Sequence, residues 1–181
     1  DAHGERHPYL HHIAALRQVA PEIPTGAIGY ITDPNECETA LSDGTADLVF
    51  LGRPLITDPA FPKKCEEGRE ADIRYCVSCN TCWRSIIDGA GLACDDNPRV
   101  GRADVHDWQP VQVTRTKHVV VVGTGVAALE AAHTAARRGH RVTVVGDHAR
   151  IGGKTMLHAG LPGGENLSSV YDYQHLMAVR H

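Results

Sequence analysis

The sequence predicts an α/β protein in which strands alternate with helices on both sides of a cysteine-rich loop. Helical and strand-like segments alternate over residues 1–75, and an apolar strand, a glycine turn, a helix and a second strand follow residue 118. Between these two regions, four cysteines lie within nineteen residues. We therefore divide the chain into a first segment (1–75), a cysteine loop (76–98), a linker (99–117) and a second segment (118–181).

The first segment has the pattern of parallel βα units, with a further short helix expected after Asp58 and Pro59. Two strands neither close a barrel nor build an independent core, so we interpret this segment as the end of a larger unit. The helices are expected at 9–19 and 34–42, and the strands at 23–28 and 47–51.

The ends of these two strands form a candidate phosphate site. Gly29 follows the first strand, and Gly52 and Arg53 follow the second. In (β/α)8 barrels, a phosphate commonly binds in the loops after the last two strands. Glycines let backbone N–H groups approach it, and an arginine can bind it through two hydrogen bonds. The alternative for Arg53 is a solvent-facing arginine at a strand end.

The cysteine loop predicts a metal centre. Cys76, Cys79, Cys82 and Cys94 have the spacing C-x2-C-x2-C-x11-C. Three closely spaced thiolates suit one corner of a four-iron cluster, and the fourth ligand comes from further along the chain. The alternatives are a four-cysteine zinc site, which usually pairs two separate C-x2-C turns, and structural thiols or disulfides. The remaining cysteines, at 37 and 65, are interpreted as buried or half-buried thiols.

The second segment begins like a dinucleotide-binding βαβ unit. The sequence G-x-G-x-x-A, with Gly123, Gly125 and Ala128, follows an apolar strand and opens a helix. Its glycines permit a tight turn and the approach of a pyrophosphate to the helix N-terminus. Asp147, one residue after the expected position, is the candidate for the ribose, or else a solvated turn aspartate. We expect strands at 119–123 and 141–145, and helices at 126–138 and from 168.

Composition excludes two partner classes. The 181-residue chain is 42% hydrophobic and 22% charged, with a net charge of −4. It therefore has no basic field for nucleic acid or anionic membrane, and we find neither an apolar stretch of transmembrane length nor a signal peptide. Clustered cysteines beside a nucleotide-type loop suggest a reducing compartment, and we predict a cytoplasmic location.

The order of these motifs resembles one family closely. The series GYITDP, ADLVFLGRPLITDP, YCVSCNTCW, CDDNP, VVVVGTGVAALEAA and RIGGK is similar to the iron–sulfur flavoenzymes of the old yellow enzyme superfamily. These include dienoyl-CoA reductase and the trimethylamine and histamine dehydrogenases. The resemblance covers residues from about 20 to 173, and the spacing around CNTCW is more like that of the amine dehydrogenases.

The resemblance implies an electron relay. It implies the end of an FMN-binding TIM barrel over the first segment, a 4Fe-4S cluster on the four cysteines, and the start of a Rossmann-like FAD/NAD(P)-binding domain. Gly29, Gly52 and Arg53 match the positions that hold the FMN phosphate, although Tyr30 stands where many relatives have arginine. The glycine turn matches the ADP-binding loop, which in the amine dehydrogenases is associated with ADP, and Gly146 replaces the usual acid.

The resemblance also sets the expected chemistry and its limits. It implies a small amine or an enoyl- or dienoyl-type substrate, with electrons exchanged through FAD, NAD(P)H or an electron-transfer flavoprotein. The family's substrate-binding residues lie on earlier barrel strands, so we assign no catalytic residue and expect this piece alone to be inactive. The alternatives are a stand-alone nucleotide-binding or electron-transfer module and a zinc-stapled binding module.

Overall fold

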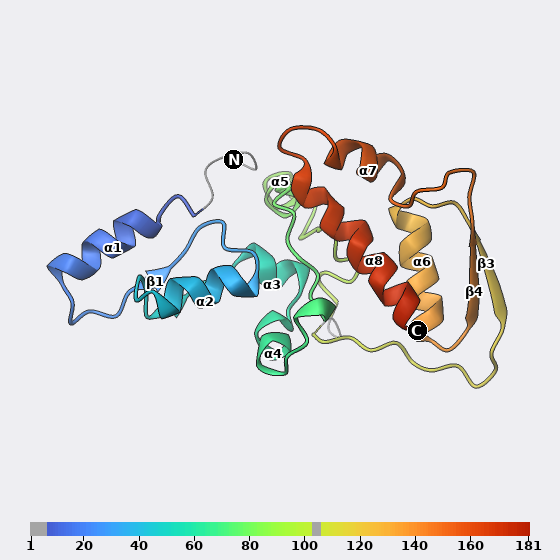
Figure 1. Ribbon diagram of the computed structural model, residues 1–181, viewed down its shortest axis with the longest axis horizontal. Helices are drawn as coiled ribbons and strands as arrows, with labels where there is room; N and C mark the ends of the chain where they lie inside the picture. Colours follow the sequence, from blue (N-terminus) through green and yellow to red (C-terminus); the bar gives the residue numbers. More distant parts are fainter. Residues whose placement is uncertain (1–6, 103–105) are drawn as a thin grey trace.

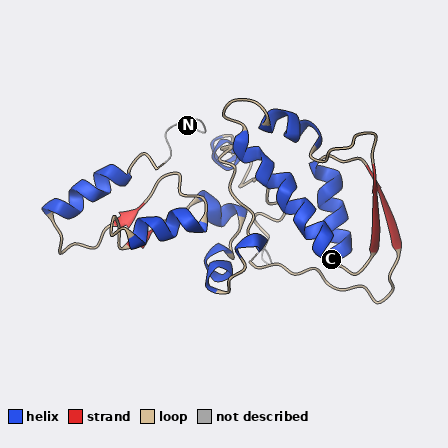
Figure 2. Cartoon of the chain, viewed as in Figure 1, coloured by secondary structure: helices blue, strands red, loops and turns tan. Residues whose placement is uncertain are grey.

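The computed structural model of the chain describes residues 7–102 and 106–181 (Figure 1). It contains helices and parallel strands in the predicted alternation, so the α/β class is confirmed. The chain is elongated, with the first segment at one end and the second segment at the other (Figure 1). Helices dominate, and the strands form two separate two-stranded sheets (Figure 2).

The first segment contains one βαβ unit and three further helices. The parallel strands β1 and β2 pair Gly26 with Leu48 and Ala27 with Val49. Each strand has only two residues, fewer than predicted, because the backbone pairing between the two segments extends over only these residues. The elements are α1 (Leu10–Val19), β1 (Gly26–Ala27), α2 (Pro34–Ser42), β2 (Leu48–Val49), α3 (Arg53–Thr57) and α4 (Phe61–Glu66).

A small apolar core holds this unit together. Ile13 of α1, Ala27 of β1 and Ala40 of α2 are all buried in it. Helix α2 begins with a capping box, in which the Asp33 carboxylate accepts hydrogen bonds from two backbone N–H groups and the Glu36 carboxylate accepts one from the Asp33 N–H. This reciprocal cap fixes the turn that follows the first strand.

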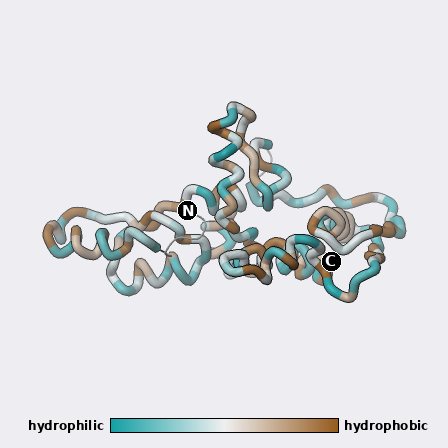
Figure 3. The backbone as a smooth tube through the Cα atoms, turned by 90° about the horizontal axis from the view of Figure 1, so that it is seen from above, coloured by the Kyte–Doolittle hydropathy of each residue, from teal (hydrophilic) through white to brown (hydrophobic). Residues whose placement is uncertain are grey.

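The cysteine loop contains a short helix that the sequence did not predict. A 3-10 turn, η1 (Glu70–Asp72), precedes the loop, and α5 (Thr81–Ile87) begins within the cysteine triplet. Seen from above, α5 and the turn after it stand away from the rest of the chain (Figure 3). The side chains of Trp83 and Ile87 are each 65% exposed there.

The second segment is a two-layer unit. Strands β3 (His118–Val122) and β4 (Arg141–Val145) form five parallel pairs. Helix α6 (Val126–Arg137) lies against this sheet, and α8 (Ser168–Arg180) packs on the far side of α6 (Figure 1). The predicted strand, helix and strand are therefore confirmed within one residue. Helix α7 (Gly153–Ala159) and the 3-10 turn η2 (Glu165–Leu167) connect the sheet to α8.

The segment between the cysteine loop and β3 is extended. Its described residues, 99–102 and 106–117, form neither helix nor strand. In the part of the chain that the structure describes, no helix is long and apolar enough to span a bilayer.

Candidate functional site

The four cysteines of the loop face one small pocket. Cys76, Cys79 and Cys82 line it from the triplet, and Cys94 lines it from the other end of the loop. All four thiols are free. The fold thus brings together the four residues that the sequence singled out as ligands.

Backbone N–H groups point toward the thiols and favour negative charge there. Ser78 and Asn80 both have left-handed backbone conformations, with φ of 57° and 63°. The Ser78 N–H donates to Cys76 Sγ at 3.4 Å, and the Asn97 N–H donates to Cys94 Sγ at 3.4 Å. Concave turns of this kind, with N–H groups aimed inward, recur at iron–sulfur and phosphate sites. The chemistry of this donor set fits a thiolate-bound cluster.

Among residues 7–102 and 106–181, no group of three or more His, Cys, Asp or Glu side chains that could hold a metal ion is present. A zinc ion draws four thiolates to within about 2.3 Å of one point. Desolvation also raises the pKa of the Cys79 thiol, so ligation by the thiolate there depends on the charge of a bound metal.

Helix α3 forms one wall of the cysteine pocket. Arg53 donates to the Asn80 side-chain carbonyl at 2.5 Å, and the Thr57 hydroxyl lies 3.7 Å from Cys94 Sγ. The side chain predicted to hold an FMN phosphate therefore contacts the cysteine loop. Its role in binding phosphate stays a prediction.

The two other candidate phosphate residues lie at one edge of the first sheet. Gly29 follows β1 and Gly52 follows β2, and the strands are parallel, so both positions lie at the carboxyl edge. Gly29 has φ of +100°, and a Cβ there would stand 2.4 Å from the Tyr9 ring. At Gly52, a Cβ would meet nothing within 4 Å. The backbone is thus open to a ligand at Gly52 and covered by Tyr9 at Gly29.

The glycine turn of the second segment has the geometry that a nucleotide loop requires. Gly123 ends β3 with φ of +117°, and its N–H donates to the Val145 carbonyl at 2.7 Å. Gly125 caps the N-terminus of α6. A Cβ on Gly123 would stand 3.6 Å from the Cβ of Ala128, so a larger residue at 128 would crowd the turn. These contacts hold the exposed N-terminus of α6 beside the sheet edge.

The residues after β4 explain why the usual acid is missing. A Cβ on Gly146 would stand 2.5 Å from the Thr124 methyl group, which occupies the space of a side chain at this position. Asp147 is displaced to the next position, where its side chain is 88% exposed and lies 3.6 Å from His148. Its role toward a ribose stays a prediction.

A second pair of glycines packs over the turn. Gly152 forms a bridge with Gly125, and its N–H donates to the Thr124 carbonyl at 2.8 Å. A Cβ on Gly153 would stand 2.9 Å from the Cα of Gly125. The two backbones therefore approach more closely than any side chain at 153 would allow. These two glycines are those of the sequence RIGGK.

A buried arginine joins the cysteine loop to the second segment. Arg74, two residues before the first cysteine, donates to both carboxylate oxygens of Glu130 on α6, at 2.8 and 3.0 Å. It also donates to the Asp96 carbonyl at 2.8 Å and lies 4.5 Å above the Tyr173 ring of α8. Sequence reasoning missed this arginine, because its partners are distant in the sequence and belong to no motif.

Burial and charge pairing shift the pKa values of the ionisable groups around Arg74. Burial alone would raise the pKa of Glu130, but the hydrogen bond from His133 and the charge of Arg74 outweigh it and lower the pKa to about 2. Burial would lower the pKa of Arg74, and the Glu130 carboxylate reverses that effect and raises it. Asp96 is the opposite case, because desolvation exceeds the attraction of Arg74 and raises its pKa to about 6.

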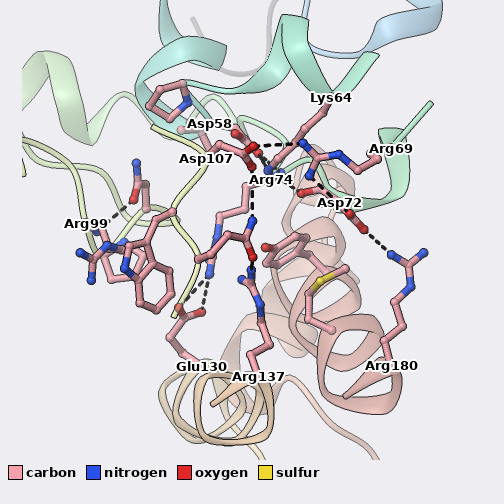
Figure 4. Close-up of a pocket in the computed structure, with 18 of the residues that line it drawn as sticks. Asp58, Lys64, Arg69, Asp72, Arg74, Arg99, Asp107, Glu130, Arg137 and Arg180 are labelled. Atoms are coloured by element: carbon pink, nitrogen blue, oxygen red, sulfur yellow. Dashed lines mark hydrogen bonds and ion pairs between the residues drawn. The ribbon is translucent and has the colours of Figure 1, made fainter. Parts of the chain in front are cut away.

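The junction lines a pocket of about 250 Å³ between the two segments (Figure 4). Its labelled carboxylates each pair with a cation: Asp58 with Lys64, Asp72 with Arg180, Asp107 with Arg69, and Glu130 with Arg74. The pocket is therefore lined by a network of ion pairs that joins the first segment, the linker and the second segment, and its Lys and Arg side chains outnumber its carboxylates by six to four.

The remaining two cysteines, Cys37 and Cys65, are half-buried, as predicted, and both thiols are free. Burial raises the pKa of Cys37 to about 11 and also raises that of Cys65. Both therefore remain neutral thiols at physiological pH.

Comparison with known protein families agrees with both halves of the chain. Residues 2–72 match the NADH:flavin oxidoreductase / NADH oxidase family. Over these residues the chain belongs to this family. Residues 111–172 match the pyridine nucleotide-disulphide oxidoreductase family, which covers the glycine turn and most of the second segment.

Individual relatives match across both segments. An NADH oxidase of Thermoanaerobacter brockii is 40% identical over 143 residues, which are 78% of this chain and 22% of the relative. A dimethylamine dehydrogenase of Hyphomicrobium sp. is 32% identical over 174 residues, 93% of this chain and 24% of the relative. The chain thus spans about a quarter of the length of these curated relatives.

A solved structure matches the arrangement of the whole chain. Histamine dehydrogenase from Rhizobium sp. 4-9 superimposes with a TM-score of 0.91 at 28% identity, over 99% of this chain and 27% of that one. The elongated arrangement of two segments around the cysteine loop is therefore that of a known flavoenzyme. The NADH:flavin oxidoreductase / NADH oxidase family consists of flavin-dependent oxidoreductases that are related to amine dehydrogenases and reductases.

The ion pair between Arg74 and Glu130 predicts a pH dependence of stability. The folded-state pKa of Glu130, about 2, lies below its ordinary value of 4.5. Its contribution to the free energy of unfolding is therefore complete above about pH 4.5 and is lost as the pH falls toward 2, on the order of 3 kcal/mol in total. Urea unfolding should give a higher unfolding free energy for the wild type than for Glu130→Gln at neutral pH. This difference in unfolding free energy should shrink as the pH falls through this window.

The matched control is Glu38→Gln, which removes an exposed carboxylate from α2. Its unfolding free energy should follow that of the wild type at every pH. If the difference in unfolding free energy between wild type and Glu130→Gln stays constant from neutral pH to about pH 2, the lowered pKa of Glu130 is wrong.

Proposed function

We propose that this chain is the electron-relay part of a flavin- and iron–sulfur-dependent oxidoreductase. The observation that carries the proposal is the single pocket lined by Cys76, Cys79, Cys82 and Cys94, with backbone N–H groups directed at two of the sulfurs. These residues would hold a 4Fe-4S cluster, which supplies one-electron transfer when bound. The protein's part is to fix the thiolates and to hydrogen-bond them.

On this proposal, the first segment is the end of an FMN-binding TIM barrel. Gly29, Gly52 and Arg53 would contribute to the FMN phosphate site from the carboxyl edge of β1 and β2. The family match over residues 2–72 supports this placement. Arg53 also contacts Asn80 of the cysteine loop. On this proposal, one side chain would therefore serve both the phosphate site and the cysteine loop.

The second segment would be the start of a Rossmann-like domain that binds the ADP portion of a nucleotide. Gly123, Gly125 and Ala128 would form the phosphate loop at the N-terminus of α6, and Asp147 would reach the ribose from its exposed position. The nucleotide is FAD, NAD(P) or ADP itself, and electrons would leave through it or through an electron-transfer flavoprotein.

The substrate is proposed to be a small amine or an enoyl- or dienoyl-type compound. The similarity to a dimethylamine dehydrogenase and to histamine dehydrogenase supports the amine class. We place the protein in a reducing compartment, the cytoplasm, because six free thiols would not persist in an oxidising one. A zinc-stapled module and a stand-alone electron-transfer or nucleotide-binding module are the alternatives.

Metal analysis tests the cluster. Anaerobically reconstituted chain should contain about four irons and four acid-labile sulfides. Cys94→Ser should lose most of both, because the three remaining thiolates leave one iron without its protein ligand. Cys37→Ser, which removes a thiol packed against the core of the first segment, should keep them. About one zinc per chain without sulfide would overturn the redox proposal in favour of the zinc module.

Nucleotide binding tests the glycine turn. Gly125 has φ of −80°, which any residue adopts, and a Cβ there would meet nothing within 4 Å. Gly125→Ala should therefore leave the unfolding free energy unchanged. It should weaken ADP binding, measured by calorimetry, by at least about tenfold, because the methyl group enters the space through which a pyrophosphate approaches.

The matched control is Gly52→Ala, since Gly52 also has a negative φ and open surroundings but lies in the first segment. It should bind ADP like the wild type. Equal ADP affinity in wild type and Gly125→Ala would place the nucleotide elsewhere.

A further inference from the structure

Two short arms of the cysteine loop carry all of its proposed ligands. The first arm contains the cysteine triplet and is preceded by Arg74, and the second, residues 94–97, returns past it. Within the second arm, the Asn97 N–H donates to Cys94 Sγ, and the Asn97 side chain donates to the Ile56 carbonyl at 2.9 Å. The hydrogen bond to the sulfur therefore depends on where the second arm lies.

Arg74 fixes the second arm relative to the first. Its guanidinium donates to the Asp96 carbonyl at 2.8 Å, next to the residue whose N–H reaches Cys94. Its own backbone N–H donates to the Asp58 carboxylate at 3.0 Å, which Lys64 also binds. Both ends of this arginine are thus held, and the side chain spans the gap between the two arms.

Glu130 in turn fixes the guanidinium. It lies one turn into α6 and is contacted by three partners from three elements: Arg74, His133 of α6, and Gln174 of α8, whose side-chain amide donates at 3.0 Å. His133 is fully buried and Gln174 nearly so. Two of the three partners thus belong to the core of the second segment, which gives the carboxylate a defined position opposite Arg74.

We propose that Glu130 is a positioning residue for the cysteine loop, acting through Arg74 on the second arm and on the hydrogen bond to Cys94. This inference deepens the proposed function and rests on it for the redox part. Glu130 touches no cysteine, so its effect on a bound cluster is indirect. Its negative charge balances that of Arg74, which lies two positions before Cys76 in the sequence, and loss of a negative charge makes the addition of an electron nearby more favourable.

The redox experiment compares Glu130→Gln with wild type in the reconstituted chain. The glutamine keeps an acceptor for Arg74 but leaves the guanidinium charge unbalanced. The cluster's midpoint potential should shift upward, with a changed electron paramagnetic resonance spectrum of the reduced state. Glu67→Gln, which removes a surface carboxylate paired with Arg69 just after α4, is the charge-matched control and should leave both unchanged. An unshifted potential in Glu130→Gln would overturn the inference.

A second experiment needs no metal and separates this inference from the proposed function. In the metal-free chain, alkylation of each thiol by iodoacetamide is followed by mass spectrometry. Arg74→Lys cannot span Glu130 and Asp96 together, so Cys94 should react at least about fivefold faster, as expected for the loss of about one hydrogen bond. Cys37, in the core of the first segment, should react at the wild-type rate.

The outcomes of the thiol experiment are distinct. Faster reaction of Cys94 alone, in Arg74→Lys and Glu130→Gln, supports positioning even if no cluster can be loaded. Unchanged reactivity of Cys94 overturns it. Equal acceleration of Cys37 and Cys94 also overturns it, because the pair would then stabilise the whole fold without acting on the loop in particular.

Discussion

The ion pair between Arg74 and Glu130 is the contact on which the arrangement of the chain depends. It joins the end of the first segment, the cysteine loop and the second segment at one point. Both side chains are largely buried, and the lowered pKa of Glu130 means that its interactions with Arg74 and His133 exceed the cost of its desolvation. Removing one partner is costly, because the other charge is left buried. The contact therefore both stabilises the chain and defines one arrangement of it.

This constraint is needed because little apolar surface joins the two segments. The first segment buries Ile13, Ala27 and Ala40 around its own sheet, and the second buries Leu129, Ala132 and Met177 between α6 and α8. Between them lie mainly charged side chains in pairs (Figure 4). Because ion pairs demand specific distances, they hold the relative position of the segments more precisely than an equally small apolar contact would.

Much of the fold could be predicted from the sequence because its signals are local. The apolar strand before Gly123, the glycine turn and the helix that follows are all encoded within twenty residues, and the predicted limits are confirmed within one residue. The cysteine spacing predicted that four thiols share a site, and they line one pocket. The strands of the first segment are shorter than predicted, because how far two strands pair depends on a partner that is distant in the sequence.

Contacts between distant residues could not be predicted in this way. Arg74 and Glu130 are 56 positions apart and lie in no recognisable motif. The clash that excludes an acid at 146 depends on Thr124, a position that the nucleotide pattern leaves open. Helix α3 has only five residues and was missed for that reason, yet it brings Arg53 to the cysteine loop. In each case the deciding information is three-dimensional proximity.

The cysteine loop is consequently held from both sides by different parts of the molecule. Helix α3 contacts it through Arg53 and Thr57, on the side of the proposed FMN site. Glu130 holds it through Arg74, on the side of the proposed nucleotide site. An electron relay requires fixed separations between its carriers, and a loop supported by one segment alone would move with that segment. Attachment to both makes the position of the four thiols a property of the whole chain.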